Sequence, residues 1–187
     1  LIYKASGVFN FAQGAMVFFA ALTFVSLVER GFSFWVAFLI TFAAMVLVAI
    51  ATERVVLRPL VNQAQITLFM ATIGLTFVLE GLSQLFWGSQ PHGLELGITD
   101  MPLEWLSANT GINVSQFDLF AALVAGILVS GLAVFFQKTR IGRALRAVAD
   151  DHQAALAVGI PLQQIWAIVW TVAGFVALVS GLLWGAR

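Results

Sequence analysis

Five long apolar stretches, separated by short groups of charged residues, dominate the chain. Their lengths are close to the roughly 20 residues that a helix needs to cross the hydrocarbon core of a bilayer. We expect membrane spans at residues 8–28, 32–52, 66–87, 119–136 and 164–185. Only helices or closed barrels satisfy the backbone in lipid, and these stretches lack the alternating pattern of barrel strands. The pattern therefore predicts an all-α integral membrane protein, a polytopic helical bundle of about five transmembrane helices.

The composition supports this prediction and narrows the function classes. Of the 187 residues, 61% are hydrophobic and only 10% are charged, whereas soluble domains carry about 25% charged residues. The formal net charge is zero, which gives no support for a nucleic-acid partner. The chain has no cysteine, and its two histidines, His92 and His152, lie in different predicted loops. We therefore expect no metal site and no cofactor.

Neither end of the chain looks like the natural end of a membrane domain. The sequence opens on Leu1-Ile2-Tyr3 inside an apolar run and stops at Gly185-Ala186-Arg187, with no polar tail at either end. We expect a single transmembrane domain over residues 1–187 that is incomplete at both ends.

Positively charged residues are concentrated in two of the predicted loops. They are Arg54 and Arg58 after the second span, and Lys138, Arg140, Arg143 and Arg146 after the fourth. The loop at 88–118 has no Lys or Arg but contains four acidic residues. Because short positive loops stay in the cytoplasm, we expect the loop at 137–161 to be cytoplasmic and the loop at 88–118 to lie outside.

The cytoplasmic loop also predicts a short amphipathic helix. It is rich in Ala, Leu and Arg, and Gly159 before Ile160-Pro161 is a helix-stop signal. Ile141, Leu145 and Val148 follow at i, i+4 and i+7, so they form one apolar stripe. Two interpretations remain open: the helix lies on lipid headgroups with its arginines as anchors, or it docks into a groove of a partner protein.

A few polar residues fall inside the predicted spans. Asn10 and Gln13 share one face of the first span, and Thr76, Glu80 and Gln84 form a stripe on the third. Polar groups at membrane depth normally face other helices or a water-filled path. Two interpretations remain open for these residues. They form hydrogen bonds between helices, with Glu80 alternatively a carboxylate that snorkels to the interface, or they line the path of a solute.

Three stretches resemble the permeases of branched-chain amino acid ABC transporters. They are the run T-R-I-G-R-A-L-R-A-V-A-D-D-x-x-A-A-x-x-x-G-I at 139–160, N-F-A-Q-G at 10–14, and R-P-L at 58–60 followed by A-T-I-G-L at 71–75 and F-W-G at 86–88. The resemblance covers most of the chain in the same order. It implies that 88–118 is a periplasmic loop and that 137–161 is a cytoplasmic coupling loop with a coupling helix.

The resemblance also implies roles for individual residues. The residues expected to couple to an ATPase are Thr139, Ile141, Gly142, Arg143, Ala144, Leu145, Arg146, Val148, Asp150 and Gly159. The candidates for the translocation path come instead from the polar positions inside the spans, and they are Asn10, Gln13, Thr76, Glu80 and Gln84. No catalytic residue and no metal ligand is expected.

Such permeases imply a set of partners in the bacterial inner membrane. These are cytoplasmic ATP-binding subunits, a second related permease, a periplasmic solute-binding protein and the surrounding lipid. The chain contains no G-x-x-x-x-G-K-[ST] phosphate loop, so we expect ATP hydrolysis on a separate chain rather than on this one.

Two departures from the pattern leave the solute open. Ala15 stands where an acidic residue commonly follows N-F-A-x-G, and Glu80 occupies a position that is usually neutral. The resemblance favours import of branched-chain amino acids, while urea, short amides or another small polar solute are alternatives. A secondary transporter that uses Glu80 to bind a proton is a further alternative. A membrane-embedded enzyme is disfavoured, because Glu80 is the one acidic residue in a predicted span.

Overall fold

A computed structural model describes residues 9–60, 63–90, 92–93, 101–102, 114–150, 155 and 157–186 of the chain. Within these residues the long elements are helices. They are α2 (Gln13–Glu29), α3 (Phe34–Ala51), α4 (Gln65–Trp87), α6 (Gln116–Lys138), α7 (Arg140–Asp150) and α9 (Leu162–Gly185). A π-helix, η1 (Thr52–Leu57), and a short 3₁₀-helix, η2 (Arg58–Leu60), continue α3.

Four helical segments of the described chain are long and apolar enough to cross a membrane. They are Phe34–Leu60, Ile66–Trp87, Gln116–Lys138 and Gln163–Gly185. The apolar helix α2 is shorter, with 17 residues. The predicted fold class, an all-α polytopic membrane bundle, is confirmed.

The first helix begins later than the predicted span at 8–28, because a side chain of α4 binds the backbone that precedes it. Thr72 Oγ1 accepts a hydrogen bond from the Phe11 backbone N–H at 3.4 Å and lies 3.0 Å from the Phe9 carbonyl oxygen. These backbone groups therefore pair with α4 instead of forming helical bonds. The chain enters the bundle as a short segment fixed against α4, and α2 starts at Gln13.

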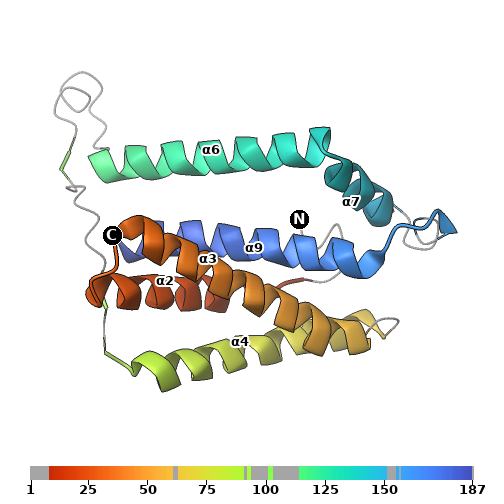
Figure 1. Ribbon diagram of the computed structural model, residues 1–187, viewed down its shortest axis with the longest axis horizontal. Helices are drawn as coiled ribbons and strands as arrows, with labels where there is room; N and C mark the ends of the chain where they lie inside the picture. The colour runs from red at the N-terminus through yellow and green to blue at the C-terminus, as the bar shows by residue number, and fades with distance from the viewer. Residues whose placement is uncertain are drawn as a thin grey trace.

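Helix α9 is the centre of the bundle and packs against α2 and α3, while α4 packs on the other side of α2 (Figure 1). Large side chains such as Trp170, Phe24 and Met45 are fully buried between these helices. Small residues allow the closest approaches, since a Cβ at Gly181 would lie 2.7 Å from the Val17 carbonyl oxygen of α2. Such close backbone packing is how helices associate in lipid, where burial against water provides little drive.

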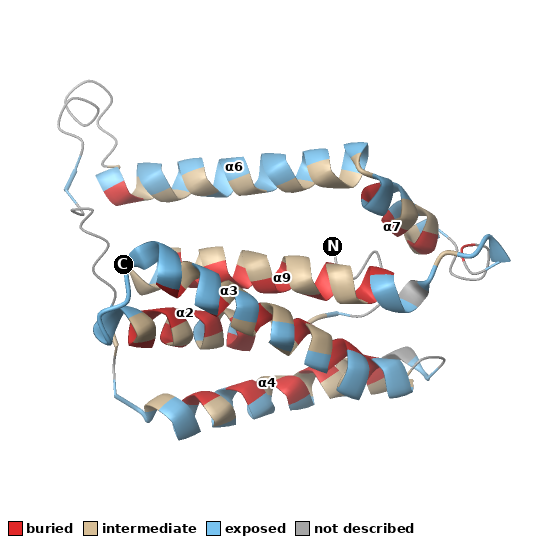
Figure 2. Cartoon of the chain, viewed as in Figure 1, coloured by how far each residue is buried: buried red, intermediate tan, exposed pale blue. Residues whose placement is uncertain are grey.

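Helix α6 lies apart from this bundle, and most of its residues are exposed (Figure 2). The chain turns sharply at Thr139, so that α7 leads from the end of α6 back toward α9 (Figure 1). The α7 helix and the η1–η2 connection lie at one end of the molecule, and the α2–α3 turn and the end of α4 lie at the other. This arrangement gathers the arginines of the predicted cytoplasmic loops at a single end.

Candidate functional site

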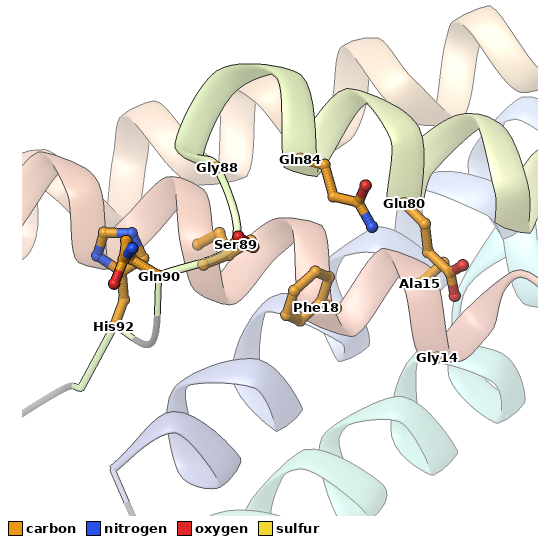
Figure 3. Close-up of a pocket in the computed structure, with 10 residues that line it drawn as sticks. Gly14, Ala15, Phe18, Glu80, Gln84, Gly88, Ser89, Gln90 and His92 are labelled. Carbon is orange, nitrogen blue, oxygen red and sulfur yellow. The ribbon is translucent and has the colours of Figure 1, made fainter.

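A cavity of about 650 Å³ lies between α2 and α4. The residues that line it are Gly14, Ala15, Phe18 and Leu22 of α2, Glu80 and Gln84 of α4, and Gly88, Ser89, Gln90 and His92 after α4. The α2 wall is small or apolar, and the polar side chains come from α4 and the segment that follows it. Figure 3 shows Glu80 and Gln84 projecting from α4 toward the α2 wall. A concave site with a few convergent polar groups is typical of small-molecule binding.

The predicted polar stripe on α4 divides between two environments. Glu80 and Gln84 line the cavity, whereas Thr76 does not. The Thr76 hydroxyl donates to the Thr72 carbonyl oxygen one turn earlier, at 3.2 Å, which is the common way for a helix in lipid to satisfy a hydroxyl. Two of the three α4 candidates therefore face the same space.

Asn10 and Gln13 lie outside this cavity and form a bridge between helices. Asn10 Nδ2 donates to Gln13 Oε1 at 2.9 Å, and Gln13 Nε2 donates to the Ala173 carbonyl oxygen of α9 at 3.2 Å. Interhelical hydrogen bonds of this kind contribute about 0.6 to 2 kcal/mol each in membranes. They attach the beginning of α2 to α9, and in this way they position the α2 wall of the cavity.

A second cavity, of about 380 Å³, lies on the other side of the same α2 residues, toward α9. Its lining is Gly14, Val17, Phe18, Ala21, Leu22, Val25, His92, Gly181, Trp184 and Gly185. Gly14, Phe18, Leu22 and His92 line both cavities. The two spaces therefore meet along α2, at the end of the bundle where α4 ends.

His92 closes this end through a contact that the sequence did not predict. Its Nδ1 lies 3.1 Å from Glu29 Oε1, at the last residue of α2. The hydrogen bond with Glu29 raises the pKa of the His92 side chain above its usual value of 6.5. The imidazole is therefore charged at pH values below this raised pKa, and the ion pair weakens as the pH rises through it.

At the opposite end, Thr139 makes the turn between α6 and α7. Its hydroxyl donates to the Phe135 carbonyl oxygen at 2.7 Å and accepts from the Gly142 backbone N–H at 3.0 Å. The second of these bonds is the N-cap interaction that fixes the first turn of a helix. A Cβ at Gly142 would come within 2.6 Å of the Phe136 backbone, so this sharp turn requires glycine at 142.

Two arginines of α7 bind the end of α6. Arg146 donates to the carbonyl oxygens of Phe136 and Gln137, and Arg143 lies within 3.5 Å of the Lys138 carbonyl oxygen. The last carbonyls of a helix have no intrahelical partner and carry the negative end of its dipole, so cations are favourable there. These arginines therefore stabilise the α6–α7 corner in addition to providing positive charge.

The apolar stripe of α7 divides in a way that neither predicted interpretation included. Leu145 and Val148 are 3% and 0% exposed and belong to the hydrophobic core, with Phe136 and Ala144 packed against it. Ile141 is 37% exposed. The inner part of the stripe thus packs against the protein's own helices, and the surface of α7 available to lipid or a partner contains Ile141 and the arginines.

Two further coupling candidates are the last residue of α7 and a glycine before α9. Asp150 is exposed at the last residue of α7. Gly159 has φ of 82°, a left-handed conformation that favours glycine and ends the segment before α9. His152 lies outside the described residues.

A buried ion pair follows α3 at the same end of the molecule. Glu53 in η1 is 2% exposed, and Arg58 donates to both of its carboxylate oxygens at 3.1 to 3.2 Å. In the sequence, Arg58 stands out as a positive loop residue and as the first residue of the R-P-L motif, and neither feature predicts its pairing with Glu53. The five-residue separation of the pair differs from the three or four of an α-helical pair, and the π-helix brings the two side chains together.

These features define a polytopic helical membrane protein with a polar-lined cavity at one end of the bundle and a braced amphipathic helix at the other. A family described as branched-chain amino acid transport system, permease component, matches residues 1–187. The chain belongs to this family.

Individual relatives agree with the family match. The high-affinity branched-chain amino acid transport system permease protein BraD of Pseudomonas aeruginosa is 26% identical over 197 residues, covering 100% of this chain and 64% of the relative. The corresponding permease protein LivH of Escherichia coli is 25% identical over 198 residues, covering 99% of this chain and 63% of the relative. The chain thus spans somewhat less than two thirds of the length of these relatives. No solved structure matches.

Proposed function

We propose that this chain is the membrane-spanning core of a permease subunit in an ATP-driven importer. The importer would carry branched-chain amino acids or a similar small solute across the bacterial inner membrane. The observation that carries this proposal is the family match over residues 1–187, together with the α7 corner built from the run at 139–160 that resembles the coupling loop. Import of urea, short amides or another small polar solute by the same architecture is the second candidate, since Glu80 and Gln84 of the cavity lining can also hydrogen-bond a polar solute without an apolar side chain.

The proposed orientation places α7 and the η1–η2 connection at the cytoplasmic face. The arginines at this end, including Arg54, Arg58 and Arg140, agree with the positive-inside rule. The loop at 88–118 would then face the periplasm. The α2–α4 cavity lies at the end of the bundle where this loop begins, since its lining includes Gly88, Ser89 and Gln90. It would therefore receive solute from a periplasmic binding protein.

The proposed partner at the cytoplasmic face is an ATP-binding subunit that contacts the exposed side of α7. Ile141, Arg140 and Arg143 are exposed there, while Leu145 holds the helix against its own bundle. A helix that is packed on other helices transmits a displacement to them, and α7 is packed on α6 and α9. A second related permease would complete the path and cover helices that have few partners within this chain.

The co-purification of ATP-binding subunits with the tagged full-length protein tests this assignment. We expect Ile141→Asp to reduce the co-purified ATPase by about tenfold or more, since a charge at an apolar contact of an interface commonly costs over 1.4 kcal/mol. Gln63→Asp, an exposed residue at the same end but outside α7, is the matched control and should leave the ATPase bound. Unchanged recovery of ATPase with Ile141→Asp would contradict the proposed role of α7.

A further inference from the structure

We propose that the α2–α4 cavity is a subsite for a small solute that carries an ammonium group, with Glu80 as the residue that selects for that group. This inference rests on the proposed transport function, because it assigns a ligand to the proposed path. It adds the residue that would recognise the ammonium group of an amino acid, and this recognition would disfavour neutral solutes such as urea or short amides.

The first argument is that the Glu80 carboxylate has no internal partner. Among the described residues, no hydrogen bond or ion pair is made to Glu80, although it lies on a span about two turns before α4 ends at Trp87. A carboxylate in a transmembrane segment is unfavourable unless a cation, a donor or water accompanies it. In contrast, the buried carboxylate of Glu53 in η1 is paired with Arg58.

The second argument concerns the other charged group of the cavity. Among the described residues that line the cavity, His92 is the one titratable side chain besides Glu80, and it is paired with Glu29 at 3.1 Å. No lysine or arginine of the described chain lines the cavity. Glu80 therefore meets no cationic partner among the described lining residues, and an ammonium group of the solute would supply one.

The third argument concerns the shape of the cavity. The α2 wall opposite Glu80 is formed by Ala15, Phe18 and Leu22, which suit a short apolar group. Gln84, one turn beyond Glu80, carries an amide that donates hydrogen bonds and can bind a carboxylate. The cavity thus offers an acceptor for an ammonium group, a donor for a carboxylate and an apolar wall, which are the three elements of an apolar α-amino acid.

The charge of the cavity can be measured directly, because the chain has no cysteine of its own. A single cysteine at Gln84→Cys is reacted with two thiol reagents of similar size, the cationic 2-aminoethyl and the anionic 2-sulfonatoethyl methanethiosulfonate. We expect the ratio of the cationic to the anionic reaction rate to fall about three- to tenfold when Glu80→Gln is added. The reason is that this substitution removes one negative charge about a helical turn from the cysteine. Ser33→Cys, in the α2–α3 turn and outside the cavity lining, should show no change in this ratio.

The chemical class of the solute is tested with two probes on a cysteine that leaves Gln84 in place, Ser89→Cys in the same lining. L-Leucine should slow the labelling of Ser89→Cys, and 4-methylvalerate, which has the same apolar group but no amine, should not. The protection by L-leucine should disappear with Glu80→Gln and persist with Glu80→Asp, which keeps the charge and also controls for misfolding. A reagent ratio that Glu80→Gln leaves unchanged, or equal protection by the amine-free acid, would overturn the proposal.

These outcomes separate the subsite from the transport function. A protein that imports solute with ATP but shows no effect of Glu80 on the reagent ratio would reject the ammonium subsite alone. A protein that shows the Glu80 effect but no ATP-driven uptake would reject the importer alone.

Discussion

Leu145→Asp should destabilise the permease itself by about 3 to 5 kcal/mol, the cost of an uncompensated charge at a buried position. Leu145 is 3% exposed and belongs to the same core cluster as Val148. An aspartate at 145 would have to leave this core, and α7 would detach from the helices that support it. We expect less folded protein in detergent and a lower temperature of thermal aggregation.

Ile141→Asp is the matched control for this substitution. It places the same charge on the same helix, but at a side chain that is 37% exposed. We expect this variant to fold normally and to lose only the contact with the ATPase. If both variants fold equally well, the assignment of Leu145 to the protein's own core is wrong, and the whole apolar stripe of α7 faces outward.

Gly181→Leu should separate α9 from α2 and cost about 3 kcal/mol, because a close backbone contact leaves no room for a side chain. A single Cβ at this position would already lie 2.7 Å from the Val17 carbonyl oxygen and 3.2 Å from the Ala21 backbone nitrogen. Gly181 also lines the cavity between α2 and α9. The substitution should therefore reduce both the thermal stability and the transport activity of the reconstituted protein.

Gly131→Leu on α6 provides the comparison for Gly181→Leu. A Cβ at Gly131 meets no atom within 4 Å in the described structure, and the residue is exposed. We expect this substitution to leave thermal stability within about 0.5 kcal/mol of the wild type. Equal losses for the two glycines would show that α2 and α9 do not approach as closely as the structure places them.

The fold class could be predicted from the sequence because lipid permits few solutions. Long apolar stretches without alternation must form helices in lipid, so the helical fold class follows from the sequence without knowledge of any tertiary contact. The start of α2 could not be predicted in this way. It depends on Thr72, whose hydroxyl pairs with the backbone of Phe9 and Phe11 more than sixty residues earlier.

The α7 helix shows where a periodic pattern stops being informative. Its period predicts an amphipathic helix, and α7 extends over Arg140–Asp150. The pattern does not specify what covers the apolar stripe, because lipid, a partner and the protein's own helices all favour the same residues. The structure assigns Leu145 and Val148 to the protein's own core and leaves Ile141 exposed.

Polar residues at membrane depth allowed two residues of the cavity lining to be predicted from the sequence, but the ion pairs could not be predicted in this way. Glu80 and Gln84 stand out as polar positions in an apolar span, and both line the cavity. Glu29 and His92 are separated by 63 residues, so no local spacing connects them. The proposed path residues Asn10 and Gln13 were also visible in the sequence, but their bond to the Ala173 carbonyl on α9 was not.

The central claim is that this chain moves solute with energy from ATP hydrolysed on another subunit. The most direct test is uptake of L-leucine into vesicles reconstituted with the full-length protein, its partner permease, its ATP-binding subunits and its solute-binding protein. We predict that uptake requires ATP on the side of the membrane where the ATP-binding subunits lie, and that it persists when the proton gradient is collapsed. We also predict that Ile141→Asp abolishes it. Uptake that needs a proton gradient and continues without ATP would contradict the claim and would identify a secondary transporter instead.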